Sequence, residues 1–84
     1  MANHINVAHH LWSKILGSKI NTIAISNLIY KTIRDGEWRY QANGSIRIIL
    51  KVGQEFVVVT GKIINSIFNI GDAWVWNGSG NIWG

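Results

Sequence analysis

The fold is decided by residues 45–62, which read SIRIILKVGQEFVVVTGK. Two apolar runs flank Gly53-Gln54, and a glycine at the first central position of a two-residue turn is typical of a type II′ β-hairpin. Pairing the strands about this turn places Arg47 opposite Thr60, and it leaves one face of the hairpin wholly apolar. That face must be buried. The opposite face carries four polar side chains, those of Arg47, Lys51, Thr60 and Lys62.

A further strand is expected over residues 37–41, and its register depends on the turn that follows it. A tight Asn43-Gly44 turn would put Arg39 on the buried face, where an unpaired guanidinium is costly. A three-residue loop over 42–44, with Gly44 left-handed, instead places Arg39 opposite Arg47, and we favour this loop. Like charges that face each other destabilise a sheet by roughly 0.2–1 kcal/mol, so an anion such as a phosphate would relieve the repulsion.

Helical periodicity precedes these strands, with apolar residues recurring every three or four positions. It predicts helices over about residues 7–17 and 21–34, and a stop at Asp35-Gly36 with Gly36 in the left-handed conformation. A last strand is expected over residues 73–76. The order predicts an α+β domain, in which two N-terminal helices pack on one face of an antiparallel sheet of roughly three to five strands. The other face is expected to be open.

The composition indicates a small basic domain. The chain has 84 residues, of which 48% are apolar, and its formal net charge is +4. We therefore expect a single domain over residues 1–84, with a loose Gly- and Asn-rich tail at about 77–84 in which Trp83 is the one candidate to dock. A basic domain suits a polyanion such as nucleic acid, and we favour this over the alternative that the charge only aids solubility.

Several classes of protein are excluded or disfavoured. The chain has no cysteine, and its three histidines have no carboxylate near them in sequence, so we expect neither a metal site nor a cofactor. No apolar run is long enough to span a bilayer. The N-terminus lacks the features of a signal peptide, which suggests a fragment of a larger effector or a short intact protein that acts in the cytoplasm. The four acidic residues are too few for carboxylate-pair or two-metal hydrolysis.

Histidines and tryptophans are the remaining candidates for chemistry. His9 and His10 fall on opposite flanks of the first helix's apolar face, and a histidine that titrates near neutrality is a natural general acid or base. Lys14 lies one turn after His10. Among the five tryptophans, Trp12 and Trp38 are expected in the core. Trp74 and Trp76 either stack bases or close the end of the core, and we favour closure.

The arrangement of these residues resembles small toxin domains of the barnase/EndoU/colicin/RelE (BECR) superfamily. The resemblance covers about residues 8–64, and it is nearest to the C-terminal toxin domains of contact-dependent growth inhibition (CdiA-type) proteins. The segments that carry it are His10-Leu11-Trp12-Ser13-Lys14, Arg34-Asp35-Gly36, residues 43–48 and residues 56–63.

The resemblance implies a metal-independent ribonuclease, often one that cleaves tRNA. Such a toxin is delivered from the producing cell to the cytoplasm of a target cell, and a cognate immunity protein, expected to be acidic, neutralises it. A translation factor is a further candidate partner. The active face in this superfamily is typically the open face of the sheet.

The chemistry assigns a role to each candidate residue. Arg47 and Arg39 would hold a phosphate, as planar guanidinium groups do well, and Thr60 would hydrogen-bond a non-bridging oxygen. His10 or His9 would shuttle a proton, or Lys62 would donate one. Further cations that flank this row are expected to bind substrate, and they are Lys51 and Lys14. The alternatives are a non-catalytic basic module that binds nucleic acid or protein, and a RelE-like toxin of a toxin–antitoxin pair that cuts mRNA on the ribosome.

Overall fold

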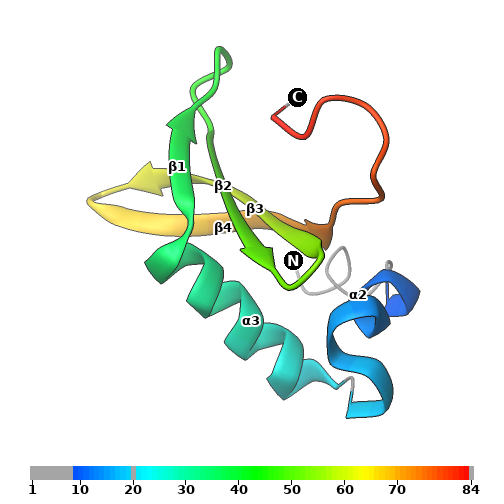
Figure 1. The fold of residues 1–84 in the computed structure, drawn as a ribbon. Coiled ribbons are helices and arrows are strands. Elements are labelled where there is room, and N and C mark those ends of the chain that lie inside the picture. Colours follow the sequence, from blue (N-terminus) through cyan, green and yellow to red (C-terminus); the bar gives the residue numbers. More distant parts are fainter. Residues whose placement is uncertain (1–8, 20, 84) are drawn as a thin grey trace.

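The computed structural model describes residues 9–19 and 21–83, which form an α+β domain as predicted (Figure 1). Its helical elements are α2 (His9–Leu16), the short 3₁₀ helix η1 (Gly17–Lys19) and α3 (Thr22–Asp35). Its strands are β1 (Glu37–Tyr40), β2 (Ile46–Val52), β3 (Glu55–Ile64) and β4 (Ile67–Val75). The strands form one antiparallel sheet in the order β1-β2-β3-β4. No helix within the described ranges is long and apolar enough to cross a membrane.

Helix α3 begins where the sequence predicts and ends differently. The side chain of Asn21 caps its start by accepting a hydrogen bond from the Ala24 N–H at 2.8 Å. At its end Gly36 has φ −76° and ψ 173°, so the prediction of a left-handed residue there is wrong. A Cβ atom at Gly36 would lie 2.5 Å from the Thr32 carbonyl oxygen and 2.8 Å from that of Ile49. The glycine therefore serves close packing of the backbone against β2.

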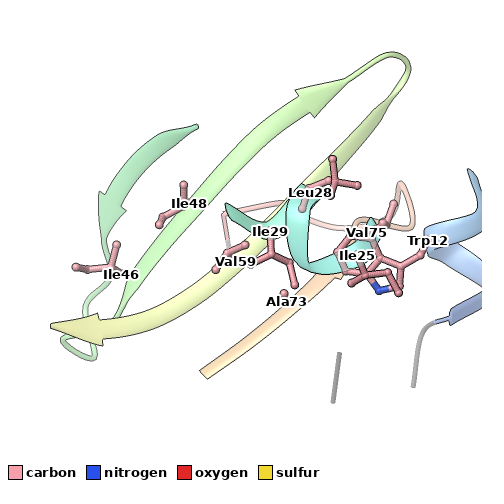
Figure 2. Packing of buried hydrophobic residues seen from close by; sticks show 10 residues of the cluster. Trp12, Ile25, Leu28, Ile29, Ile46, Ile48, Val59, Ala73 and Val75 are labelled. Atoms are coloured by element: carbon pink, nitrogen blue, oxygen red, sulfur yellow. The ribbon is translucent and has the colours of Figure 1, made fainter. Parts of the chain in front are cut away.

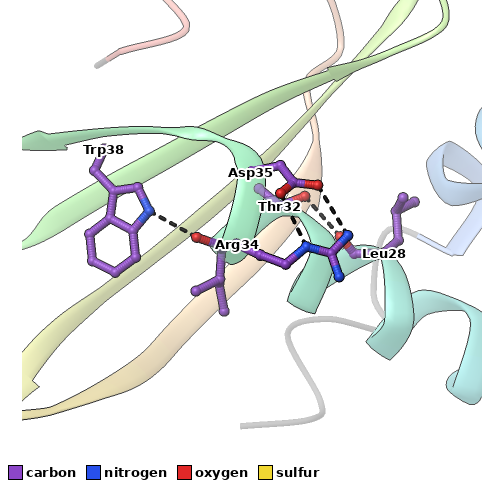
Figure 3. Close-up of polar contacts among 6 residues, drawn as sticks. Leu28, Thr32, Arg34, Asp35 and Trp38 are labelled. Atoms are coloured by element: carbon purple, nitrogen blue, oxygen red, sulfur yellow. Dashed lines mark hydrogen bonds and ion pairs between the residues drawn. The ribbon is translucent and has the colours of Figure 1, made fainter.

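The junction between α3 and β1 is fixed by polar contacts (Figure 3). The indole N–H of Trp38 donates a hydrogen bond to the Ile33 carbonyl at 2.9 Å, and its ring packs at 5.2 Å from that of Phe68. Trp38 is nevertheless 42% exposed, so the prediction that it belongs to the core is wrong. Beside it, the hydrogen bond from Arg34 lowers the pKa of Asp35.

One cluster of buried side chains joins the helices to the sheet (Figure 2). Trp12 comes from α2, and three residues come from α3. Strands β2, β3 and β4 contribute alternate residues, which all lie on one side of the sheet because side chains alternate along a strand. The members of the cluster are Trp12, Ile25, Leu28, Ile29, Ile46, Ile48, Val57, Val59, Ala73 and Val75. We call this side of the sheet the apolar face, and the other side the polar face.

The predicted register of the first three strands is confirmed. Gly53 has φ 62° in the turn between β2 and β3, and Arg47 pairs with Thr60. In the loop between β1 and β2, Gly44 has φ 87°, and Arg39 pairs with Arg47. The three-residue loop therefore places Arg39 on the polar face, as the cost of burying a guanidinium predicts.

Strand β4 is longer than predicted, and a bulge interrupts its pairing with β3. Asn65 and Ser66 form the turn between them with φ values of 53° and 66°, an uncommon conformation for residues other than glycine. Further along, Thr60 pairs with Asp72 but Gly61 pairs with Ile70, which leaves one extra residue in β4. Such bulges bend a strand and re-aim the side chains beside it.

The bulge predicts different effects on stability for two glycine substitutions. In Gly61→Ala the new Cβ would overlap the carbonyl oxygen of Asn69 and lie 2.8 Å from the Phe68 ring. We expect a loss of about 1–3 kcal/mol in the free energy of unfolding, as in other overpacked sites. In Gly71→Ala the nearest atom is 3.6 Å away, so we expect a change within about 0.5 kcal/mol. Urea unfolding of both variants checks this, and equal stabilities would contradict the bulge geometry.

Candidate functional site

The polar face gathers most of the residues that the sequence singles out. Alternation along the strands and the observed pairings put charged and hydroxyl side chains of three strands on this side. They are Arg39 of β1, Arg47 and Lys51 of β2, and Thr60 and Lys62 of β3. Strand β4 adds Asp72 and Trp74, which pair with Thr60 and Val58.

Three of the predicted catalytic residues line one hollow on this face. Its volume is about 510 Å³, within the range of small-molecule sites. Arg47, Thr60 and Lys62 contribute to its wall, together with Asp72 and Trp74 from β4. We call this hollow the Arg47 pocket. It combines two cations, a hydroxyl, a carboxylate and an aromatic ring.

The guanidinium of Arg47 is held firmly at the edge of this pocket. Its Nη1 donates a hydrogen bond of 2.7 Å to the Ile82 carbonyl oxygen, and its Cζ lies 5.4 Å from the centre of the Trp74 ring. Its Nε is buried and has no hydrogen-bond partner among the described residues. A guanidinium fixed in this way is preorganised to receive an anion, because little side-chain freedom is left to lose.

The C-terminal segment, residues 77–83, lies over part of the polar face. Figure 1 shows it on the side of the sheet away from α3. The Trp83 ring lies 4.1 Å from the Cζ of Arg39, and the indole N–H of Trp76 donates to the Ser79 carbonyl at 3.1 Å. The face predicted to be open is therefore partly covered, where Ile82 contacts Arg47 and Trp83 contacts Arg39, although Arg39 itself stays exposed. The sequence singled out Trp83 as the tail residue that could dock, but it did not indicate where, because the tail has no period of its own.

Arg39 faces Arg47 as predicted, but the chain itself relieves their repulsion. The Nε of Arg39 forms an ion pair with Glu37 at 2.8 Å on the same strand. The carbonyl oxygen of Ile82 accepts a hydrogen bond from Arg47 and so partly offsets the charge of that guanidinium. A bound phosphate is therefore not needed to explain the pair, and Arg39 does not line the Arg47 pocket.

The other predicted substrate-binding cations lie towards the opposite end of the sheet. Lys51 is 5.9 Å from the Phe56 ring and lines a hollow beside Trp83. Lys14 lines a separate hollow with Glu55 and Phe56. The structure thus does not bring Lys51 and Lys14 to the Arg47 pocket.

His9 and His10 belong to α2, but their side chains lie outside the described part of the structure, so their predicted role stays a prediction. Trp74 and Trp76 were expected to close the core, and this is wrong. Trp74 lies beside Arg47, and Trp76 packs edge-on at 5.8 Å against Phe56 on the polar face. In the described ranges no group of three or more His, Cys, Asp or Glu residues could hold a metal ion.

Asp72 is the pocket residue that sequence reasoning missed. Its strand was expected to begin only at residue 73, because the turn at Asn65-Ser66 lacks the usual glycine. The bulge at Gly71 also breaks the alternation that would have placed Asp72 on the polar face. The available signal was its position two residues before Trp74, which strand alternation places on the same face.

Comparison of this chain with protein-family models, with curated proteins and with solved structures found no match. A fold by itself does not define a function. What the chain does must therefore follow from the chemistry of the Arg47 pocket and of the tail beside it.

The contact between Arg39 and Trp83 predicts a measurable coupling. A double-mutant cycle of Arg39→Ala and Trp83→Ala should give a coupling energy of about 0.5–1 kcal/mol in urea unfolding, as for exposed cation–π pairs. The control cycle combines Trp83→Ala with Tyr30→Ala on α3, whose side chain is exposed. It should be additive within about 0.5 kcal/mol. A coupling no larger than that of the control would show that the tail does not rest on Arg39.

Proposed function

We propose that this chain is a metal-independent endoribonuclease and that the scissile phosphate of RNA binds in the Arg47 pocket. The observation that carries the proposal is that Arg47, Thr60 and Lys62 line one hollow of about 510 Å³. Two cations and a hydroxyl suit a phosphodiester, because charge-assisted hydrogen bonds to phosphate are strong. The net charge of +4 favours RNA as the source of that phosphodiester.

The reaction needs no metal ion when it uses the 2′-hydroxyl of the RNA as nucleophile. Arg47 would neutralise the charge that develops on the phosphorus oxygens in the transition state. Thr60 would donate a hydrogen bond to a non-bridging oxygen. Lys62, which is exposed at the rim, would give a proton to the departing 5′-oxygen.

We further propose that this ribonuclease is a toxin. The resemblance to the BECR superfamily supports an arrangement of two N-terminal helices on one face of the sheet and an active site on the other. On this basis tRNA is the proposed substrate, in the cytoplasm of a target cell. The proposed partner is an acidic immunity protein, whose carboxylates would complement Arg47 and Lys62. A RelE-like toxin that cuts mRNA, or one that needs a translation factor, would use the same pocket.

A non-catalytic basic binding module is the second candidate. The observation that favours it is the engagement of both arginines by the tail, through Ile82 and Trp83. In such a module the polar face would bind RNA or a protein without turnover. The two candidates differ at Thr60, whose hydroxyl contributes little to general docking.

Thr60→Ala should lower RNA cleavage by about 100-fold, comparable to the removal of one hydrogen bond that stabilises a developing oxyanion. Binding of RNA, measured by fluorescence anisotropy, should change by less than about threefold, because charge supplies most of the affinity. Cleavage is measured with EDTA present and total bacterial RNA as substrate. The matched control is Thr22→Ala, at an exposed position of α3, which should cleave like the parent protein.

A second arm of this experiment tests the nucleophile. An oligonucleotide with 2′-deoxyribose at the cleaved position should bind and stay intact. Cleavage of the deoxy substrate, or loss of all cleavage in EDTA, would contradict the proposed mechanism. Intact RNA with the parent protein would favour the binding module.

A further inference from the structure

We infer that Asp72 is the general base of this site, the group that removes the proton from the 2′-hydroxyl of RNA. The inference rests on the proposed ribonuclease function and assigns its missing proton acceptor. It would replace His9 or His10 in that role.

The backbone brings Asp72 to the pocket and holds its side chain. Asp72 pairs with Thr60 across β3 and β4, directly beside the bulge. One carboxylate oxygen, Oδ1, accepts a hydrogen bond of 2.8 Å from the N–H of Ala73. The side chain is half-buried and lines the Arg47 pocket. One oxygen is thus used for positioning, and the other is left for chemistry.

The ion pairs distinguish Asp72 from Asp35 and Glu37, and its place in the Arg47 pocket distinguishes it from Glu55, which lines a separate hollow with Lys14. Asp35 is paired with Arg34, and Glu37 is paired with Arg39. Asp72 shares its pocket with Arg47 and Lys62, yet among the described residues neither cation lies within the 4.0 Å that defines an ion pair with it.

Opposite charges that line one pocket without closing on each other leave a gap between them. A ribose 2′-hydroxyl beside the phosphodiester on the neighbouring 3′-oxygen suits such a gap, with the hydroxyl at the carboxylate and the phosphate at the cations. A fully paired carboxylate would have to break its ion pair before it could accept a proton. Asp72 carries no such cost.

The step balances with the groups present. The carboxylate of Asp72 takes the proton of the 2′-hydroxyl while the 2′-oxygen forms a bond to phosphorus. The bond from phosphorus to the 5′-oxygen breaks, and Lys62 supplies the proton to that oxygen. The products are a 2′,3′-cyclic phosphate and a free 5′-hydroxyl. Proton exchange with water then restores Asp72 and Lys62, and no co-reactant is consumed.

Asp72→Asn is the direct test, because asparagine keeps an oxygen that can accept from the Ala73 N–H. Cleavage should fall by about 100- to 10,000-fold, the usual contribution of a general base. RNA binding should stay the same or become tighter, since a negative charge is lost. The matched control is Asp35→Asn, which removes the same charge from the end of α3 and should cleave normally.

The pH profile supplies a readout that a structural role would not move. In the parent protein kcat/KM should fall at acidic pH as the base becomes protonated, and this acid limb should be absent from Asp72→Asn. The charged groups that face Asp72 from the neighbouring strands are Arg47 of β2 and Lys62 of β3. Asp72→Glu, which keeps a carboxylate, should retain the acid limb at a reduced rate.

The outcomes separate this inference from the proposed function. If the parent protein cleaves RNA and Asp72→Asn cleaves equally well with an unchanged acid limb, the inference is wrong and the ribonuclease stands. If the parent protein leaves RNA intact, the proposed function fails with it. Urea unfolding establishes whether each variant is folded. If Asp72→Asn does not fold, the inference is tested by the cleavage rate and acid limb of Asp72→Glu.

Discussion

Burial of one face of the β2–β3 hairpin is the constraint on which the rest of the structure depends. Ile46, Ile48, Val57 and Val59 are all almost fully buried, in a cluster that also contains side chains of α2 and α3. Their burial stabilises the fold by roughly 6–12 kcal/mol, which is comparable to the whole stability of a small domain. A slip of one residue would expose all four side chains. Because side chains alternate along each strand, the same register places Arg47 and Thr60 on the other face.

Besides strand alternation, two features determine which groups meet on the polar face. The bulge between β3 and β4 brings Asp72 next to Thr60, so that a carboxylate joins a basic surface. The tail then holds Arg47 from the other side through the Ile82 carbonyl. Together they turn a row of solvated charges into a pocket in which cations and an anion stand apart. The proposed function uses the cations to bind a phosphate and the carboxylate to accept a proton.

The sequence predicted the strand pairing correctly where local turn and burial preferences determine it. Gly53 specified its turn, and the cost of burying Arg39 selected the right loop. The failures have physical causes. Asn65 and Ser66 adopt positive φ without a glycine, so the start of β4 was hidden, and Asp72 with it. The tail and the extended Gly36 depend on contacts distant in sequence, which no periodicity encodes.

Under the proposed function, the polar face is where this protein acts on RNA. The most direct measurement is an NMR titration of the ¹⁵N-labelled protein with an uncleavable RNA oligonucleotide that carries 2′-deoxyribose throughout its cleaved positions. The largest shifts should fall on Thr60, Asp72 and the Nε–H of Arg47, whereas Ile23 and Tyr30 on α3 should be unchanged. Shifts centred on α3, or no shifts on the polar face at saturating RNA, would contradict it.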